Sequence, residues 1–185
     1  MKLIIAIFVT ALLFVASIKA QDEWATADTQ TVRLAPNKFS RLPRKIVNDL
    51  EKRGYTIPQY YDETTKHNVV QGEFKQKGRK DWAILCSRNR TSAILIYWNG
   101  STKGVSRIAS GYDKDYLQTI GGGRIGFSRV IGVANAKYII DHYKSYGGPK
   151  PPKISHNGIE DAFAEKASEI LYLHRGKWLR LQGAD

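Results

Sequence analysis

The sequence predicts a single α+β domain, with a mostly antiparallel sheet of about six to eight strands and two or three helices covering one side. Three observations predict this fold. The middle third holds runs of Val, Ile, Leu and aromatic residues separated by Gly, Lys, Arg and Asn, which is typical of strands joined by short turns. Segments 43–53 and 135–146 carry apolar residues at helical spacing. The composition, 42% apolar and 11% aromatic, is sufficient for a buried core.

The N-terminal segment has the layout of a signal peptide. Lys2 precedes an apolar run from Leu3 to Ala16, and small residues follow at Ser17 and Ala20. The run is shorter than the roughly 18 to 20 residues that a membrane-spanning helix needs, and no stop-transfer segment follows it. We therefore expect residues 1–20 to be a signal peptide, with no transmembrane span after its removal. Residues 21–185 are expected to fold as one domain in the periplasm or outside the cell.

The first part of this domain predicts one helix between two short extended segments, 31–34 and 55–59. Pro43 suits the first turn of a helix, and Gly54 suits the position just after its end. Apolar residues at i, i+1 and i+4 from Ile46 share one helical face. We expect the helix to run from 43 to 53.

The middle third predicts four strands, at 68–74, 82–87, 93–98 and 105–109. Asn and Gly accept the positive φ that tight turns require. The connection 87–91 and the Asn99-Gly100 pair are therefore expected to form hairpin turns, which would pair successive strands antiparallel.

The last third predicts a strand at 127–134, followed by a helix that Asn135 caps and that ends before Gly147. The proline-rich segment 147–153 is expected to be a stiff, exposed connector. We then expect a short helix from 157 or 158 to 167, and a closing hairpin of 170–174 with 178–181. The sequence shows no internal repeat that covers the chain.

One cysteine, Cys86, lies in a run of apolar residues. It has no partner for an internal disulfide, so the apolar core has to stabilise the domain. We interpret Cys86 as a small buried hydrophobic residue and not as a reactive thiol.

Residues 72–85 carry a Gly-x-Phe segment, a Gly-containing loop, and then Asp81 followed by an apolar strand. This segment resembles one FG-GAP repeat of the integrin-propeller type, which implies a β-loop-β unit. The loop carboxylates of that family can hold calcium, but Lys75, Gln76 and Lys77 stand in their places here. We expect Asp81 to fix the loop through backbone hydrogen bonds. More broadly, the order of elements resembles that of secreted bacterial proteins, which implies a periplasmic or extracellular location but no particular activity.

The string from Gly121 to Gly126 matches the dinucleotide fingerprint G-x-G-x-x-G. That fingerprint requires a helix directly after it, whereas the residues from Phe127 onward are β-like. We interpret it as a loop entering a strand. An alternative is that its glycine amides and Arg124 form a nest for an anion.

Residues for catalysis or metal binding are few. The histidines occur in no recognised triad or nucleophile-elbow context. His142, His156 and Glu160 are the candidates for an unrecognised hydrolase with a His/carboxylate site. His156 and Glu160 have a spacing that one helical face could share, but Gly158 between them favours a helix entrance over a metal site. Asp113 and Asp115 are assigned to a loop. We predict no metal and no cofactor.

Basicity is the one global feature of the chain. The net charge is +12, and removal of residues 1–20 lowers it only to +10, so the positive charge belongs to the folded domain. A solvated basic surface explains this charge, and a site for an anionic polymer is the alternative. The candidate binding residues lie in two turns and one glycine-rich loop: Lys75, Lys77, Arg79, Lys80, Arg88, Arg90 and Arg124. Antiparallel pairing would place the 75–80 and 88–90 turns at opposite ends of the sheet.

These observations predict an exported, non-catalytic protein that binds a protein partner or an anionic envelope component, with the His/carboxylate hydrolase as the alternative. Export and the absence of a nucleic-acid-binding motif argue against nucleic acid as the ligand.

Overall fold

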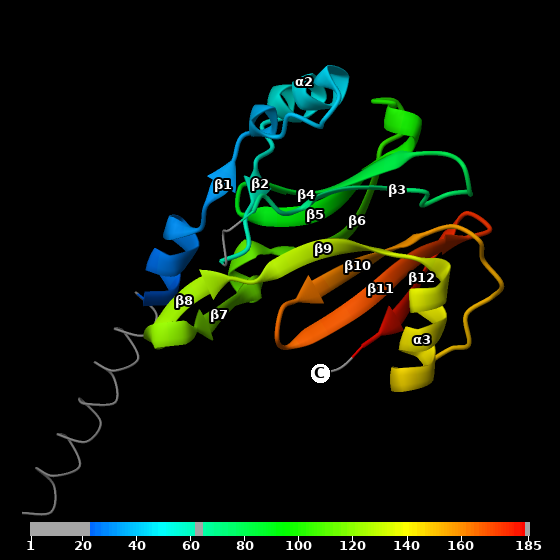
Figure 1. The fold of residues 1–185 in the computed structure, drawn as a ribbon. Coiled ribbons are helices and arrows are strands. Elements are labelled where there is room, and N and C mark those ends of the chain that lie inside the picture. Colours follow the sequence, from blue (N-terminus) through cyan, green and yellow to red (C-terminus); the bar gives the residue numbers. More distant parts are fainter. Residues whose placement is uncertain (1–22, 62–64, 184–185) are drawn as a thin grey trace, which may run out of the picture.

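A computed structural model describes residues 23–61 and 65–183. The predicted signal peptide lies outside these residues. The fold is α+β, as predicted, and consists mainly of antiparallel strands with a few helices. Two four-stranded sheets are stacked, and one helix covers the outer face of each (Figure 1).

The first sheet is an antiparallel meander of β3 (Val69–Gly72), β4 (Asp81–Arg88), β5 (Thr91–Tyr97) and β6 (Ser106–Tyr112). Its predicted turns are present. Asn89 and Arg90 have φ angles of 52° and 57° in the two-residue turn that closes β4 on β5. Asn99 and Gly100, with φ angles of 50° and 65°, turn the chain between β5 and β6. In both places Asn allows the left-handed backbone that these turns need.

The second sheet repeats this meander with β9 (Arg129–Ala134), β10 (Gly158–Phe163), β11 (Ala167–His174) and β12 (Lys177–Gln182). The repeat is one of topology, and the sequence does not show it. Instead of a short loop, the second copy has α3 (Ala136–Tyr146) and a long connector between its first two strands.

The predicted short helix from 157 or 158 to 167 is wrong, because Gly158–Phe163 is strand β10. This strand lies between β9 and β11 and is hydrogen-bonded to both. Ile159 is fully buried against the first sheet, while Glu160 faces α3, where it accepts a hydrogen bond from Tyr138. Hydrogen bonding to β9 and β11 outweighs the local preference of this segment for a helix.

The main core fills the space between the two sheets. It includes Leu85 and Ile94 from the first sheet, Phe74 from the loop after β3, and Ile131, Ile159 and Leu171 from the second sheet. Each sheet buries one face against the other and carries apolar residues on its remaining face as well, and a helix covers each of these outer faces. The expectation of helices on one side is therefore wrong, since they lie on opposite outer faces.

The helix α2 (Arg44–Lys52) covers the first sheet with its buried residues Ile46, Val47 and Leu50. Strands β1 (Arg33–Leu34) and β2 (Ile57–Pro58) pair beside it. On the second sheet, α3 begins at the predicted cap, where the Asn135 side chain accepts a hydrogen bond of 2.8 Å from the Tyr138 amide. Local capping chemistry thus places both ends of α3, because Gly147 follows its last turn with φ 77°.

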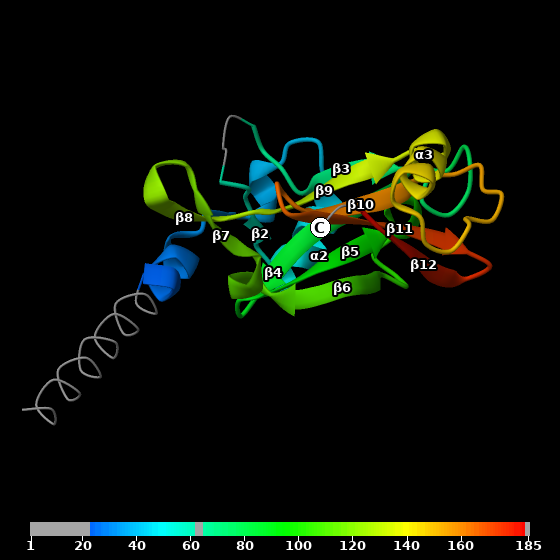
Figure 2. The ribbon, with the colours of Figure 1, turned by 90° about the horizontal axis from the view of Figure 1, so that it is seen from below.

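A small hairpin projects at one end of the molecule. It consists of β7 (Leu117–Ile120) and β8 (Arg124–Phe127). The helical segment 23–30 lies beside it (Figures 1 and 2). The fingerprint-like glycine string is therefore the turn of this hairpin and the start of β8, as predicted.

The two sheets are joined along β3 and β9. Asn68, just before β3, donates to the Arg129 carbonyl at 3.2 Å and accepts from the Ile131 amide at 3.0 Å. Asn68 has a left-handed φ of 72°. At the other side of the stack, β6 and β12 each form the edge of their own sheet.

One end of the space between the sheets holds charged residues. Arg129 on β9 is fully buried and binds both carboxylate oxygens of Asp161, at 2.9 and 2.7 Å. It also donates to Ser92 at 3.0 Å, and its guanidinium lies 4.3 Å from the Tyr116 ring centroid. Glu169 stands directly opposite Asp161 in the sheet and pairs with Arg180 at 2.9 Å.

We expect Glu169→Gln to stabilise the protein at pH 7. Burial raises the pKa of Glu169, an effect that the attraction of Arg180 does not cancel. When folding raises the pKa of a carboxyl, the folded protein loses stability as the pH rises from the unfolded pKa through the folded pKa. The gain should therefore be present near neutral pH and vanish below about pH 4, where the residue is protonated in both states. Thermal unfolding at pH 3, 5 and 7 measures it, with the exposed Glu51→Gln as control. A constant difference at all three values would contradict the prediction.

Candidate anion-binding site

The predicted binding residues occupy three separate places. Strand β4 runs from Asp81 to Arg88, so the β3–β4 loop and the β4–β5 turn lie at opposite ends of the first sheet, as antiparallel pairing predicts. Arg124 is exposed on the projecting hairpin and donates to the Gly121 carbonyl at 3.3 Å. The structure therefore brings no single patch together from all seven residues.

The β3–β4 loop carries Lys75, Lys77, Arg79 and Lys80, and Asp81 holds it. The fully buried Asp81 carboxylate accepts from the Lys75 amide at 3.2 Å and from the Asn99 amide at 2.7 Å. Asp81 thus makes the backbone hydrogen bonds expected of it. Lys80 lies 3.5 Å from Glu73, and the Lys75 ammonium lies 5.8 Å from the Trp98 ring centroid.

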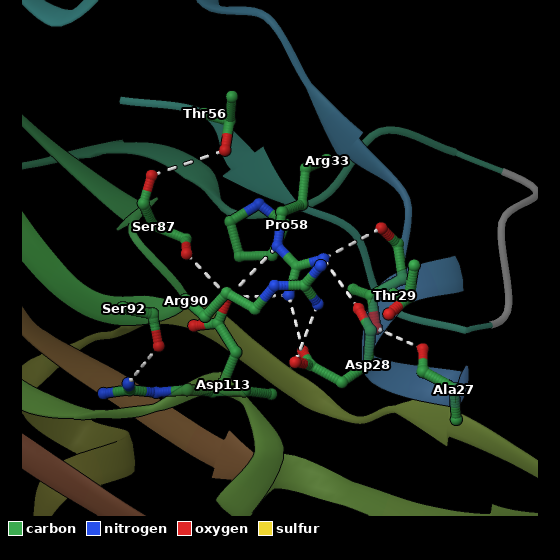
Figure 3. A network of polar contacts seen from close by, with 12 residues as sticks. Ala27, Asp28, Thr29, Arg33, Thr56, Pro58, Ser87, Arg90, Ser92 and Asp113 are labelled. Atoms are coloured by element: carbon green, nitrogen blue, oxygen red, sulfur yellow. Dashed lines mark hydrogen bonds and ion pairs between the residues drawn. The ribbon is translucent and has the colours of Figure 1, made fainter. Parts of the chain in front are cut away.

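The two arginines of the β4–β5 turn have different surroundings. Arg90 pairs with Asp28 of the N-terminal helical segment at 2.7 Å (Figure 3), so its charge is already neutralised within the protein. The Arg88 guanidinium lies over the Tyr55 ring, 5.3 Å from its centroid. Only Arg88 of the pair is therefore available to an external anion.

Arg88 lines a hollow of about 480 Å³ on the outer face of the first sheet, beside the C-terminal end of α2. We call it the arginine pocket; its lining is Arg53, Tyr55, Arg88, Asn89, Thr91 and Arg107. Three arginines line it, from the position just after α2, the end of β4, and β6. Among the residues that the structure describes, no carboxylate lines it.

Tyr55 arranges two of these arginines. The Arg53 guanidinium lies 5.1 Å from the Tyr55 centroid, close to the distance of Arg88 from the same ring. Arg53 also pairs with Asp49 at 3.1 Å, and Asp49 accepts a hydrogen bond of 2.7 Å from the Tyr97 hydroxyl. Arg107 is exposed and donates to Ser110 at 2.8 Å. Asp49 is thus the counter-ion of Arg53, which leaves the positive charges of Arg88 and Arg107 in the pocket.

The sequence alone did not single out Arg53 and Arg107 as parts of one site. Arg53 is one of several basic residues near the first helix, and Arg107 is the lone arginine of a predicted strand. One signal could have placed Arg107. Successive side chains of a strand point to opposite faces of the sheet. Because Ile108 packs into the core between the sheets, its neighbour Arg107 faces the side that α2 covers.

The hydrolase candidates do not form a site together. His142 is buried on α3 between the rings of Tyr138 and Tyr146, with centroids 6.0 and 4.9 Å away. The Glu160 carboxylate accepts from the Tyr138 hydroxyl at 2.8 Å, a bond that raises the pKa of Tyr138 to about 12. His156 lines a hollow between the sheets near Trp178. Among residues 23–61 and 65–183, no histidine is hydrogen-bonded or ion-paired to a carboxylate.

Cys86 is fully buried in β4, as predicted, and burial raises the pKa of its thiol well above the ordinary value. A thiol of this kind is unreactive because the thiolate is the nucleophile. In the part of the chain that the structure describes, no group of three or more His, Cys, Asp or Glu side chains is placed to hold a metal ion. No helix in that part is long and apolar enough to cross a bilayer.

Comparison with known proteins gives no relative on which an assignment could be based. No protein-family model matches the sequence, and neither a curated protein nor a solved structure matches it. The function therefore has to be argued from the arginine pocket and the other surfaces of this molecule.

Proposed function

We propose that this protein is an exported, non-catalytic binding protein that holds the phosphate groups of an anionic envelope polymer in its arginine pocket. The observation that carries the proposal is the meeting of Arg53, Arg88 and Arg107 in a hollow without a lining carboxylate. Like charges gathered in this way repel one another, and a bound polyanion removes that repulsion. The signal-peptide layout of residues 1–20 supports export.

The chemistry of the pocket favours phosphate. A guanidinium presents a planar fork of N–H donors that matches two oxygens of a phosphate group. Stacking on Tyr55 holds the planes of Arg53 and Arg88 and reduces the freedom that they lose on binding. The hydroxyl of Thr91 and the side-chain amide of Asn89 add neutral donors at the pocket wall.

The test compares two double variants that each remove two positive charges. Arg88→Gln with Arg107→Gln alters the arginine pocket but keeps Arg53, whose pairing with Asp49 stabilises the fold. Lys144→Gln with Lys150→Gln is the matched control, because both lysines are exposed and lie on or just after α3, on the opposite side of the molecule. Binding of inorganic polyphosphate is measured by calorimetry over a salt series.

We expect the arginine variant to bind polyphosphate about tenfold or more weakly than the unmodified protein, which corresponds to roughly 1.4 kcal/mol. The slope of log K against log salt should fall by about two, one for each lost phosphate contact. The lysine variant should retain both the affinity and the slope. Equal weakening by the two variants would show that net charge alone attracts the polymer and would refute a site at the arginine pocket.

A further inference from the structure

A line of two hollows follows the open side of the sheet stack. The sheets are joined along β3 and β9, and opposite that junction the edge strands β6 and β12 each contribute residues to both hollows. Ser106 and Trp178 line the first, and Ser110 and Gln182 line the second. Four residues of strand span about 13 Å, so the two hollows follow one another along the same pair of edge strands at about that spacing. We call this line of two hollows the seam and each hollow one section of it.

The first section of the seam, with a volume of about 500 Å³, is aromatic and positively charged. Trp98 and Trp178 are half-buried and stacked, with centroids 6.1 Å apart and planes at 25°. The Trp98 indole donates to Ser106 at 3.0 Å, which fixes the orientation of the ring. Lys75 and Arg175 are exposed at its rim, and within residues 23–61 and 65–183 no carboxylate lines it. Flat aromatic rings beside two exposed cations suit a ligand with an apolar ring face and a negative group.

The second section of the seam, about 370 Å³ in volume, mixes apolar walls with hydrogen-bonding groups, and among the described residues its charges are paired. Asp161 is paired with Arg129, and Glu169 is paired with Arg180. Further hydrogen-bonding groups come from Ser110, Ser168 and Gln182. Tyr116 and Phe163 form an edge-to-face wall with centroids 5.9 Å apart. A section with many donors and acceptors but no net charge suits hydroxyl groups.

A β-bulge shapes this second section. The pairing of β5 with β6 shifts between Ser92 and Ile94, and Ala109 takes a left-handed φ of 50°. The bulge directs the Ala109 carbonyl to the buried Arg129, which donates to it at 2.5 Å. Bulges re-aim strands at binding sites, and a non-glycine residue in this conformation is strained. The strained residue lies at the wall of the hollow.

We infer that the seam binds a linear acidic polysaccharide. A uronate-type carboxylate pairs with Lys75 and Arg175, and the apolar face of a sugar ring packs on Trp178 and Trp98. The following sugars enter the second section, where their hydroxyls meet its hydrogen-bonding groups and their ring faces meet its apolar walls. This site shares no lining residue with the arginine pocket, which lies on the outer face of the first sheet. One hydrogen bond links the two, from Arg107 to Ser110.

Oligogalacturonates of two and six sugars are the probes, and binding is followed by tryptophan fluorescence and calorimetry. Trp178→Ala should weaken hexamer binding about tenfold, the loss typical of a central aromatic contact. Trp24→Ala is the matched control, since Trp24 is exposed on the N-terminal helical segment outside the seam, and it should change the affinity less than about twofold. Thermal unfolding confirms that each variant is folded.

Two further variants test the order of the sections. Lys75→Gln should remove the preference for oligogalacturonate over a neutral glucan, because it removes a rim cation. Ser110→Trp should fill the second section, so that the six-sugar oligogalacturonate binds no more tightly than the two-sugar one. Unchanged hexamer binding in the folded Trp178→Ala variant would overturn the inference. Tighter binding of single-stranded DNA than of the hexamer would also overturn it.

The two proposals can fail independently. Arg88→Gln alone should leave hexamer binding unchanged, because Arg88 lines the arginine pocket and not the seam. Arg107 is kept in this comparison, since it donates to Ser110 of the seam at 2.8 Å. Trp178→Ala should leave polyphosphate binding unchanged. Loss of hexamer binding in the Arg88→Gln variant would place the glycan outside the seam and overturn this inference, whatever happens to polyphosphate.

Discussion

Arg129→Met is expected to lower the free energy of unfolding by about 3 to 5 kcal/mol, the usual cost of breaking a buried ion pair by removing one partner. Arg129 is fully buried and its partner Asp161 is only 6% exposed, so methionine would leave a carboxylate without its counter-charge and away from water. The Ser92 hydroxyl and the Ala109 carbonyl would lose their donor at the same time. Urea or guanidinium unfolding at pH 7 measures the change.

Two variants separate the charge effect from a packing effect. Arg129→Met with Asp161→Leu removes both charges and should recover most of the lost stability, because no unpaired ion remains. Arg180→Met removes an arginine that is 56% exposed and should cost less than about 1 kcal/mol. If the double variant were as unstable as Arg129→Met, shape and not charge would explain the loss.

Asp113→Ala is expected to cost about 3 kcal/mol and to release the N-terminal segment from the first sheet. Asp113 is fully buried. Its carboxylate accepts from Ser87 at 2.6 Å and from Arg33 at 3.1 and 2.9 Å (Figure 3). Arg33 in turn pairs with Asp28 at 2.8 Å. Alanine would remove the acceptor that ties the segment to β4.

Hydrogen exchange distinguishes this effect from general destabilisation. We expect residues 23–34 to lose protection more strongly than β4 and β5 in the Asp113→Ala variant, since local opening follows the loss of local contacts. Asp115→Ala is the matched control, because Asp115 lies on the same 3₁₀ turn but is exposed. Uniform loss of protection across both regions would contradict the role of Asp113 as a tie.

The contrast between Asp113 and Asp115 shows where sequence reasoning fails. Both carboxylates are assigned to a loop from their local context, and both do lie on one turn. Their burial differs because Ser87 and Arg33, 26 and 80 residues away in the chain, meet only Asp113. The arginine pocket was missed for the same reason, since its three arginines come from three separate elements.

Local sequence determined the features that depend on local backbone chemistry. The helix at Asn135, the hairpin turn through Asn89, the buried Cys86 and the loop held by Asp81 were all predictable, since capping, positive φ and apolar runs act over a few residues. The tertiary structure alone decided that residues 158–163 form a strand, that two sheets stack with a helix on each outer face, and which charged side chains meet. These outcomes depend on hydrogen bonds and burial between segments that are distant in the sequence. Such long-range interactions together outweigh the local conformational preference of any single segment.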